Sequence, residues 1–354
     1  MNDQSQASIS DFIREIPKVE LHVHLEGAIR AQTLLELAQK NHKTLPVDDI
    51  AGLREWYQFR DFPDFISKYI LLSDCIQTVE DLYFIGKEFL AGQAAQHIRY
   101  SEVTYTAYTH YKQKNIPIPD QIAALMRASD WAERELGVKM RLIIDIARET
   151  SAEEGYLVAQ EAVQAMDKGV VALGLGGYEI GYPPGRFHKA FALAHSEGLP
   201  CILHAGETGG ADSIWEALEV GHSVRIGHGV HCLEDQSLVA YLREKQIPLE
   251  VCPTSNVCLG VAPDIAHHPV HELMQQGLYV TINSDDPALF STTLNDEYQK
   301  VAGEFALSEE EIHGLVVKGI QASLMSEEEK KIFLGKVDRK REEITEKHLK
   351  NIKL

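Results

Sequence analysis

The sequence lacks several features that would assign a class of protein. It carries 34 basic side chains against 53 acidic ones, a formal net charge of −19, whereas nucleic-acid and anionic-membrane surfaces select for basic patches. It has no apolar run near the ~18 residues that span a bilayer, and its acidic N-terminus lacks the apolar centre of a secretory signal. We therefore expect a cytoplasmic protein with no nucleic-acid partner and no membrane association.

Cysteines are few and irregularly spaced. The five cysteines are an odd number scattered over 354 residues, and none forms a C-x-x-C pair. A disulfide framework would normally use an even number in a short chain, and a ribbon-type zinc site needs paired cysteines. The cysteine pattern therefore indicates a reducing compartment. Any metal site is expected to use residues other than cysteine.

Strand-like runs alternate with helix-period segments. Eight short, β-branched runs are present: 18–22, 99–105, 140–146, 170–175, 200–204, 224–226, 248–252 and 278–283. Near-continuous apolar strands that alternate with helices indicate a parallel sheet, and eight such units favour a closed barrel over an open sheet. The Gly-rich turn of an open sheet is replaced after the first run by His22-Val23-His24. The predicted fold class is an α/β (β/α)8 TIM-type barrel.

Two segments lie outside the repeating unit. Residues 31–89 are too long for one crossover helix and carry aromatics at helical spacing, so we expect extra helices after strand 1 that form a packing layer, a lid, or both. The charged stretch 336–354 predicts a solvent-exposed C-terminal helix. The candidate catalytic and metal-binding residues come from strands one, five, six and eight. Residues 1–354 are therefore expected to form one domain with a core of about 17–335.

Histidines and carboxylates gather where the predicted strands end, which is where barrel enzymes carry their active sites. His22 and His24 are two apart and point to one face of strand one, His204 ends strand five, and Asp285 follows strand eight. Three imidazoles and one carboxylate suit a divalent transition metal, above all zinc, and leave a position for water. We predict these four residues as metal ligands.

The remaining polar residues at the strand ends indicate proton chemistry beside a single metal ion. A second ion would need a bridging anion, and the fourth run has no ionisable residue. One zinc per chain is therefore predicted, with His228 as a catalytic residue rather than a ligand. Glu207, three residues beyond His204, is placed for proton transfer. Asp286 stays free to hold the nucleophilic water or a substrate nitrogen.

Five segments together resemble the adenosine/adenine deaminases of the amidohydrolase superfamily, above all the bacterial adenosine deaminases. They are PKVELHVHLEGAI (17–29), HAGE (204–207), RIGHG (225–229), CPTSN (252–256) and NSDDP (283–287). The resemblance implies a mononuclear zinc barrel enzyme that hydrolyses the exocyclic amine of a purine to ammonia. It is not the other zinc deaminase class, because the H-x-E and P-C-x-x-C signature of that class is missing.

The resemblance implies roles for individual residues. His228 would accept or orient the proton of the attacking water, and protonated Glu207 would donate to purine N1, which requires a raised pKa. Asp286 would bind N7, and the Gly177 N–H would contact N3, where the absence of a side chain lets the backbone approach the ring. Glu26 would face the sugar, and His24 would contact the substrate as well as the metal.

The residues that would contact the substrate combine features of several members of the family. Glu26 stands where adenosine deaminases usually have aspartate and adenine deaminases commonly have glutamate, whereas Gly176-Gly177 and RIGHG are of the nucleoside type. Thr104 and Ala107 replace an arginine and a proline of the usual pattern in the second strand. We expect deamination of adenosine to inosine. The alternatives are adenine and a 5′-modified adenosine such as aminodeoxyfutalosine.

Two other classes of function stay open. A dinuclear amidohydrolase would act on amides or phosphoesters, and a non-catalytic scaffold would keep the fold without turnover. Glu207, His228 and Asp286 count against the scaffold, because a scaffold needs no proton-transfer groups around a metal. The expected partner is a small purine nucleoside or base, since the acidic surface disfavours a phosphorylated nucleotide.

Overall fold

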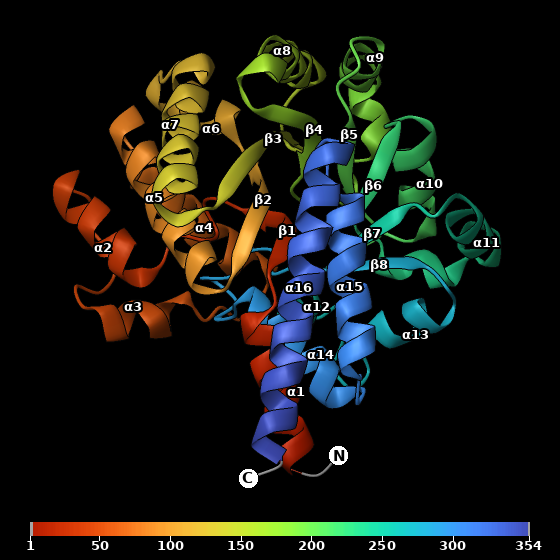
Figure 1. The fold of residues 1–354 in the computed structure, drawn as a ribbon. Coiled ribbons are helices and arrows are strands. Elements are labelled where there is room, and N and C mark those ends of the chain that lie inside the picture. The colour runs from red at the N-terminus through yellow and green to blue at the C-terminus, as the bar shows by residue number, and fades with distance from the viewer. Residues whose placement is uncertain (1–2, 353–354) are drawn as a thin grey trace.

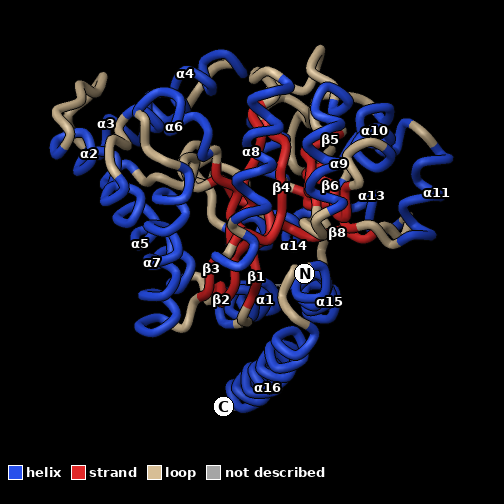
Figure 2. The backbone as a smooth tube through the Cα atoms, turned by 90° about the horizontal axis from the view of Figure 1, so that it is seen from above, coloured by secondary structure: helices blue, strands red, loops and turns tan. Residues whose placement is uncertain are grey.

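The computed structural model describes residues 3–352 and places eight parallel strands in one sheet. Neighbours in the sheet are neighbours in the sequence, from first to last, and helices enclose the strands (Figures 1 and 2). The strands are β1 (Lys18–His24), β2 (Ile98–Tyr105), β3 (Lys139–Ala147), β4 (Val170–Gly176), β5 (Cys201–Ala205), β6 (Ser223–His228), β7 (Pro248–Val251) and β8 (Tyr279–Ile282). The predicted (β/α)8 barrel is confirmed.

The strands are buried on both faces, which explains their near-continuous apolar sequences. Side chains such as Leu142, Leu173 and Leu203 have no exposed surface and join the main hydrophobic core. The interior also holds ionised side chains: Arg225 of β6 pairs with Glu102 of β2 and Glu250 of β7, at 2.6 and 2.5 Å. Buried charges are tolerated when they are paired in this way.

The barrel closes between β1 and β8 through short-range contacts instead of a regular ladder. Val23 and Asp285 form an isolated parallel bridge, in which the His24 N–H donates to the Asp285 carbonyl at 2.8 Å and the Asp285 N–H donates to the His22 carbonyl at 3.1 Å. The side-chain oxygen of Asn283 accepts from the N–H of His22 at 3.1 Å. Closure therefore brings the first and last strand ends into direct contact.

Helices cover the outside of the barrel. Helices α6 to α15 are α6 (Ala107–Lys114), α7 (Ile118–Leu136), α8 (Ala152–Gln164), α9 (His188–Ser196), α10 (Ala211–Glu219), α11 (Gln236–Lys245), α12 (Pro253–Cys258), α13 (Val270–Gln275), α14 (Leu294–Glu304) and α15 (Glu309–Ala322). Helix α8 ends at Gln164, and residues Met166–Lys168 form a 3-10 turn before Gly169, whose φ is +99°.

The segment after β1 forms four helices, as expected. They are α2 (Ala31–Lys40), α3 (Ile50–Tyr57), α4 (Phe62–Asp74) and α5 (Val79–Ala95). Helix α5 packs against α7 on the outer layer. Helix α4 instead lies over the mouth of the barrel, where Phe65 stacks on Phe290 with ring centroids 5.5 Å apart. The insertion therefore supplies both an outer layer and a cover for the mouth.

The two ends of the described chain lie side by side (Figure 1). Helix α16 (Glu327–Ile352) begins before the predicted 336, and the final two residues of that prediction lie outside the described residues. Helix α1 (Asp3–Glu15) was not predicted, and Glu15 forms ion pairs with Lys340 at 3.1 Å and Lys347 at 2.7 Å. Within residues 3–352, no helix combines the length and apolar character that crossing a membrane requires.

Candidate active site

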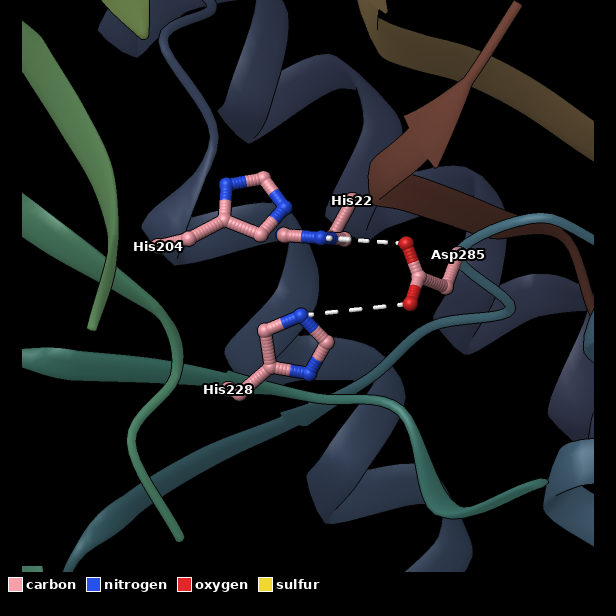
Figure 3. Close-up of side chains that lie close together, drawn as sticks. All are labelled: His22, His204, His228 and Asp285. Carbon is pink, nitrogen blue, oxygen red and sulfur yellow. Dashed lines mark ion pairs between the residues drawn. The ribbon is translucent and has the colours of Figure 1, made fainter. Parts of the chain in front are cut away.

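Five predicted residues converge at the C-terminal mouth of the barrel. His22 and His24 come from the end of β1, His204 from β5, His228 from the last position of β6, and Asp285 from the segment after β8 that bridges to Val23. Figure 3 shows His22 and His228 directed at opposite oxygens of the Asp285 carboxylate, with His204 beside His22. The parallel strands explain this meeting, because all of their carboxyl ends lie at one rim.

The imidazole Nε2 atoms crowd around one carboxylate oxygen. His24 Nε2 lies 3.1 Å from His204 Nε2 and 3.3 Å from Asp285 Oδ1, and His22 Nε2 lies 3.5 Å from the same Oδ1. Ligand atoms of His22, His204, His228 and Asp285 all lie within 4.8 Å of one another. His22 Nε2 is buried and has no hydrogen-bond partner. Such an orphaned buried nitrogen fits a divalent cation as its missing partner.

Hydrogen bonds behind the rings aim these nitrogens inward. Glu250 Oε2 accepts from His22 Nδ1 at 2.8 Å, and the Leu175 carbonyl accepts from His204 Nδ1 at 2.9 Å. In a neutral imidazole, a proton held on Nδ1 leaves Nε2 unprotonated, so its lone pair can bind a metal. The Ser255 hydroxyl donates to Asp285 Oδ2 at 2.6 Å and holds the carboxylate in place.

His228 and Asp285 share an unusual backbone conformation. Their φ angles are +62° and +64°, in the left-handed region that non-glycine residues rarely occupy. Strain of this kind concentrates at functional sites, where surrounding structure holds it. Burial lowers the pKa of His228 to about 4, so the ring is neutral at pH 7. Its Nε2 lies 3.7 Å from Glu207 Oε1 and 3.9 Å from Asp285 Oδ2.

Glu207 has the properties of a protonated acid. Burial, followed by the negative charges of Asp285 and Glu179, raises its pKa to about 8. Glu179 also holds the loop that carries Glu207: it accepts from the N–H groups of residues 206, 207, 208 and 209 at 2.6–3.1 Å. The same carboxylate therefore positions Glu207 and favours its neutral form. No role for Glu179 was predicted from the sequence.

Asp286 is buried beside Asp285 and rests on a glycine. Burial, and then the charge of Asp285, raise the pKa of Asp286 well above its usual value. Its Oδ1 is buried without a hydrogen-bond partner. A Cβ placed on Gly27 would lie 1.6 Å from that Oδ1. Gly27, in the HLEGA segment, is therefore required by the position of Asp286, a dependence that the sequence does not display.

A cavity of about 450 Å³ opens beside these groups. Its inner end is lined by His24, His204, His228, Glu207, Asp285 and Asp286, and its outer end by side chains of α4 and α6 that include Ser73, Thr109, Lys112 and Gln113. Gly177 lies on the wall with a φ of +97°, and a Cβ there would come within 2.8 Å of Glu149 Oε2. The wall at this point therefore has to be bare backbone.

Glu26 and Asp145 occupy the middle of the cavity wall. Glu26 is held by protein donors: Oε1 lies 3.2 Å from His110 Nε2, and Oε2 accepts from the Tyr69 hydroxyl at 3.3 Å. Asp145, at the end of β3, has a buried Oδ1 without a hydrogen-bond partner, and burial raises its pKa to about 7. Sequence reasoning found Glu26 but missed Asp145, whose only signal is a carboxylate inside an apolar strand.

Comparison with known proteins assigns the family. Residues 17–340 match the sequence model of the adenosine deaminase family. The chain is 35% identical to the adenine deaminase of Chlorobium phaeobacteroides (93% of this chain, 98% of that one) and 36% identical to the aminodeoxyfutalosine deaminase of Streptomyces avermitilis (95% and 94%). The crystal structure of adenine deaminase from Arthrobacter aurescens superposes with a TM-score of 0.87 at 33% identity (92% and 98%). The chain belongs to the adenosine/adenine deaminase family of the amidohydrolase superfamily and is a hydrolytic deaminase acting on a C–N bond.

Proposed function

We propose that this chain removes the 6-amino group of a purine by hydrolysis, with one zinc ion held by His22, His24, His204 and Asp285. Imidazole and carboxylate ligands with an open position are those of catalytic zinc. The ion, when bound, supplies Lewis-acid activation of the water that attacks C6. The inward-facing Nε2 atoms and the orphaned His22 nitrogen support this ligand set.

The other polar groups act on the purine ring. Glu207, protonated below a pKa of about 8, donates to N1, which makes C6 more electrophilic. Asp286, whose pKa burial raises well above its usual value, holds N7 through a donated hydrogen bond. The N–H of Gly177 donates to N3, where the missing side chain allows close approach. These contacts orient the ring and its amine toward the metal ligands.

For the substrate we favour an adenosine that carries a substituent at its 5′ position. The observation that carries this choice is the cavity, whose 450 Å³ continues past Glu26 to the polar groups of α6. This volume lies within the range of about 300–1,000 Å³ that encloses drug-sized ligands, and a free base would fill only its inner end. The relatives cited above are named for adenine and aminodeoxyfutalosine, so adenosine itself, expected from the sequence, lacks their support.

Free adenine is the second candidate. It is favoured by relatives named adenine deaminase, including one of known structure, and by Glu26 in place of aspartate. In this case Asp145 would accept from N9–H of the base rather than from a sugar hydroxyl.

A substrate panel separates these candidates. Adenine, adenosine and 5′-substituted adenosines are offered to the zinc-loaded enzyme, and ammonia release is measured. We expect the highest kcat/KM on a 5′-substituted adenosine. Higher turnover of adenine would replace our choice with the second candidate, and no ammonia from any of them would contradict purine deamination. Metal analysis should give one ion per chain; two ions would support the dinuclear alternative.

A further inference from the structure

A buried hydrogen-bonded chain runs from the start of α13 to the ring of His228. It contains His268, which precedes α13, and Asn256 of α12. Asn256 and His228 have no exposed surface, and His268 is 3% exposed. The geometry of the chain fixes the direction of each hydrogen bond, because its first member can act only as a donor.

That first member is the backbone N–H of Val270. It donates to His268 Nδ1 at 3.0 Å, so Nδ1 of this imidazole carries no proton. Burial lowers the pKa of His268 to about 4, and the neutral ring then carries its proton on Nε2. His268 Nε2 lies 3.0 Å from Asn256 Oδ1, which accepts that proton's hydrogen bond. The oxygen and nitrogen of the Asn256 amide are thereby assigned.

The amide nitrogen of Asn256 consequently faces His228. Asn256 Nδ2 lies 3.4 Å from His228 Nδ1. An amide NH2 group only donates, so His228 Nδ1 is the acceptor and the proton of the neutral ring lies on Nε2. Nε2 is the atom that faces Glu207 and Asp285, and it has no hydrogen-bond partner of its own.

We infer that His268 and Asn256 are positioning residues that hold His228 in the Nε2–H tautomer, so that His228 orients the attacking water as a hydrogen-bond donor. An Nε2 that already carries a proton cannot receive one from the water. The proton of the water then passes to Glu207, which becomes a carboxylate once it has donated its own proton to N1 and which lies 3.7 Å from His228 Nε2. This inference rests on the proposed function for its water, but the tautomer itself is a property of the protein alone.

The tautomer can be measured without turnover. Zinc-loaded protein labelled with 15N-histidine is studied by long-range 1H–15N correlation, and the His228 signals are identified by their loss in His228→Gln. We expect a protonated Nε2 and a bare, hydrogen-bonded Nδ1. A protonated Nδ1 on His228 would overturn the inference, whereas inactivity toward aminopurines would contradict only the proposed function.

Two variants test the direction of the hydrogen bonds between His268, Asn256 and His228. In Asn256→Asp the carboxylate accepts from Nδ1–H, which should reverse the tautomer and lower kcat by about 100-fold or more with a smaller change in KM. In His268→Ala the amide is free to turn over, and the His228 signals should report both tautomers. His267→Gln, at an exposed neighbouring position, is the matched control and should change neither spectrum nor rate. An unchanged His228 spectrum in folded Asn256→Asp and His268→Ala would contradict the inference that these two residues set the tautomer of His228.

Discussion

Glu250 Oε2 lies 2.8 Å from His22 Nδ1, with both side chains buried inside the barrel. The other oxygen of Glu250 pairs with Arg225 at 2.5 Å. The carboxylate thus connects a proposed metal ligand to the ion-pair network of the barrel interior. Because it accepts from Nδ1, it holds the proton of a neutral His22 ring on that atom, and Nε2 is directed at the other proposed ligands.

Replacing Glu250 by glutamine should weaken metal binding. The amide keeps the shape of the side chain but loses the charge that fixes the tautomer of His22, and such outer partners contribute about 10–100-fold in metal affinity. Competition with a chromophoric chelator measures the affinity. Glu244→Gln, on an exposed side chain, serves as the control. Equal zinc affinities of Glu250→Gln and the unmodified protein would show that Glu250 acts only on stability.

Activity should decline at alkaline pH. Glu207 must be protonated to donate to the ring, and its folded pKa is raised from 4.5 to about 8. It is therefore competent below that pH, and kcat/KM should fall about tenfold per pH unit above it. Initial rates of ammonia release across the pH range test this.

The variant Glu207→Gln separates the acid from other titrating groups. It should retain the metal and lose about 10²–10⁴-fold in kcat, because the amide cannot transfer a proton. If the variant keeps its activity, or if the parent rate is constant through about pH 9, Glu207 is not the acid.

Asp145 should give the enzyme a preference for substrates that carry the ribose hydroxyls. Its unpartnered Oδ1 lines the cavity, and a hydrogen bond from a ribose hydroxyl to the ionised form of this carboxyl is worth ~1.5–3 kcal/mol, or about 10–100-fold in kcat/KM. The parent should prefer adenosine to its 2′- or 3′-deoxy analogue, and Asp145→Asn should lose most of that preference. Asp167→Asn, an exposed acid, is the control. An equal loss on adenine and on the nucleosides would assign Asp145 to the base instead.

Gly27→Ala should inactivate the enzyme without exposing the barrel core. The added Cβ would lie 1.6 Å from Asp286 Oδ1, so the carboxylate must leave its place in the cavity. Gly314→Ala in α15 is the matched control, since a Cβ there meets nothing within 4 Å; it should stabilise the fold by about 0.5–1 kcal/mol. Thermal unfolding and kcat/KM together check the pair. Full activity of Gly27→Ala would show that Asp286 does not act from the position beside Gly27 that is described above.

The sequence predicts the barrel and the rim because both depend on local patterns. The strands are continuous apolar runs, and the first polar residue after each run marks where the strand ends, as His204 does. Residues two apart on a strand share a face, so the pairing of His22 with His24 follows from spacing alone. That residues at the ends of different strands form one site follows from the rule that the carboxyl ends of parallel barrel strands lie at the same rim.

What the sequence does not reveal depends on distant contacts. Glu179 and Glu250 act on other elements of the barrel through hydrogen bonds, and neither has a spacing that marks it. Helix α1 begins in a polar stretch, and its ion pairs are made with the far end of the chain. Gly27 resembles any turn glycine until Asp286 is placed beside it.

The bridge between Val23 and Asp285 determines when the site can exist during synthesis. The ribosome releases His22 and His24 early, but their carboxylate partner emerges only after seven further strands. A nascent chain therefore has only part of the proposed ligand set until almost the whole barrel has been made, and contacts this far apart in sequence form slowly. If the proposed ligands hold the metal, binding has to wait for the contact between Val23 and Asp285, and a chain that stops short of β8 should be inactive.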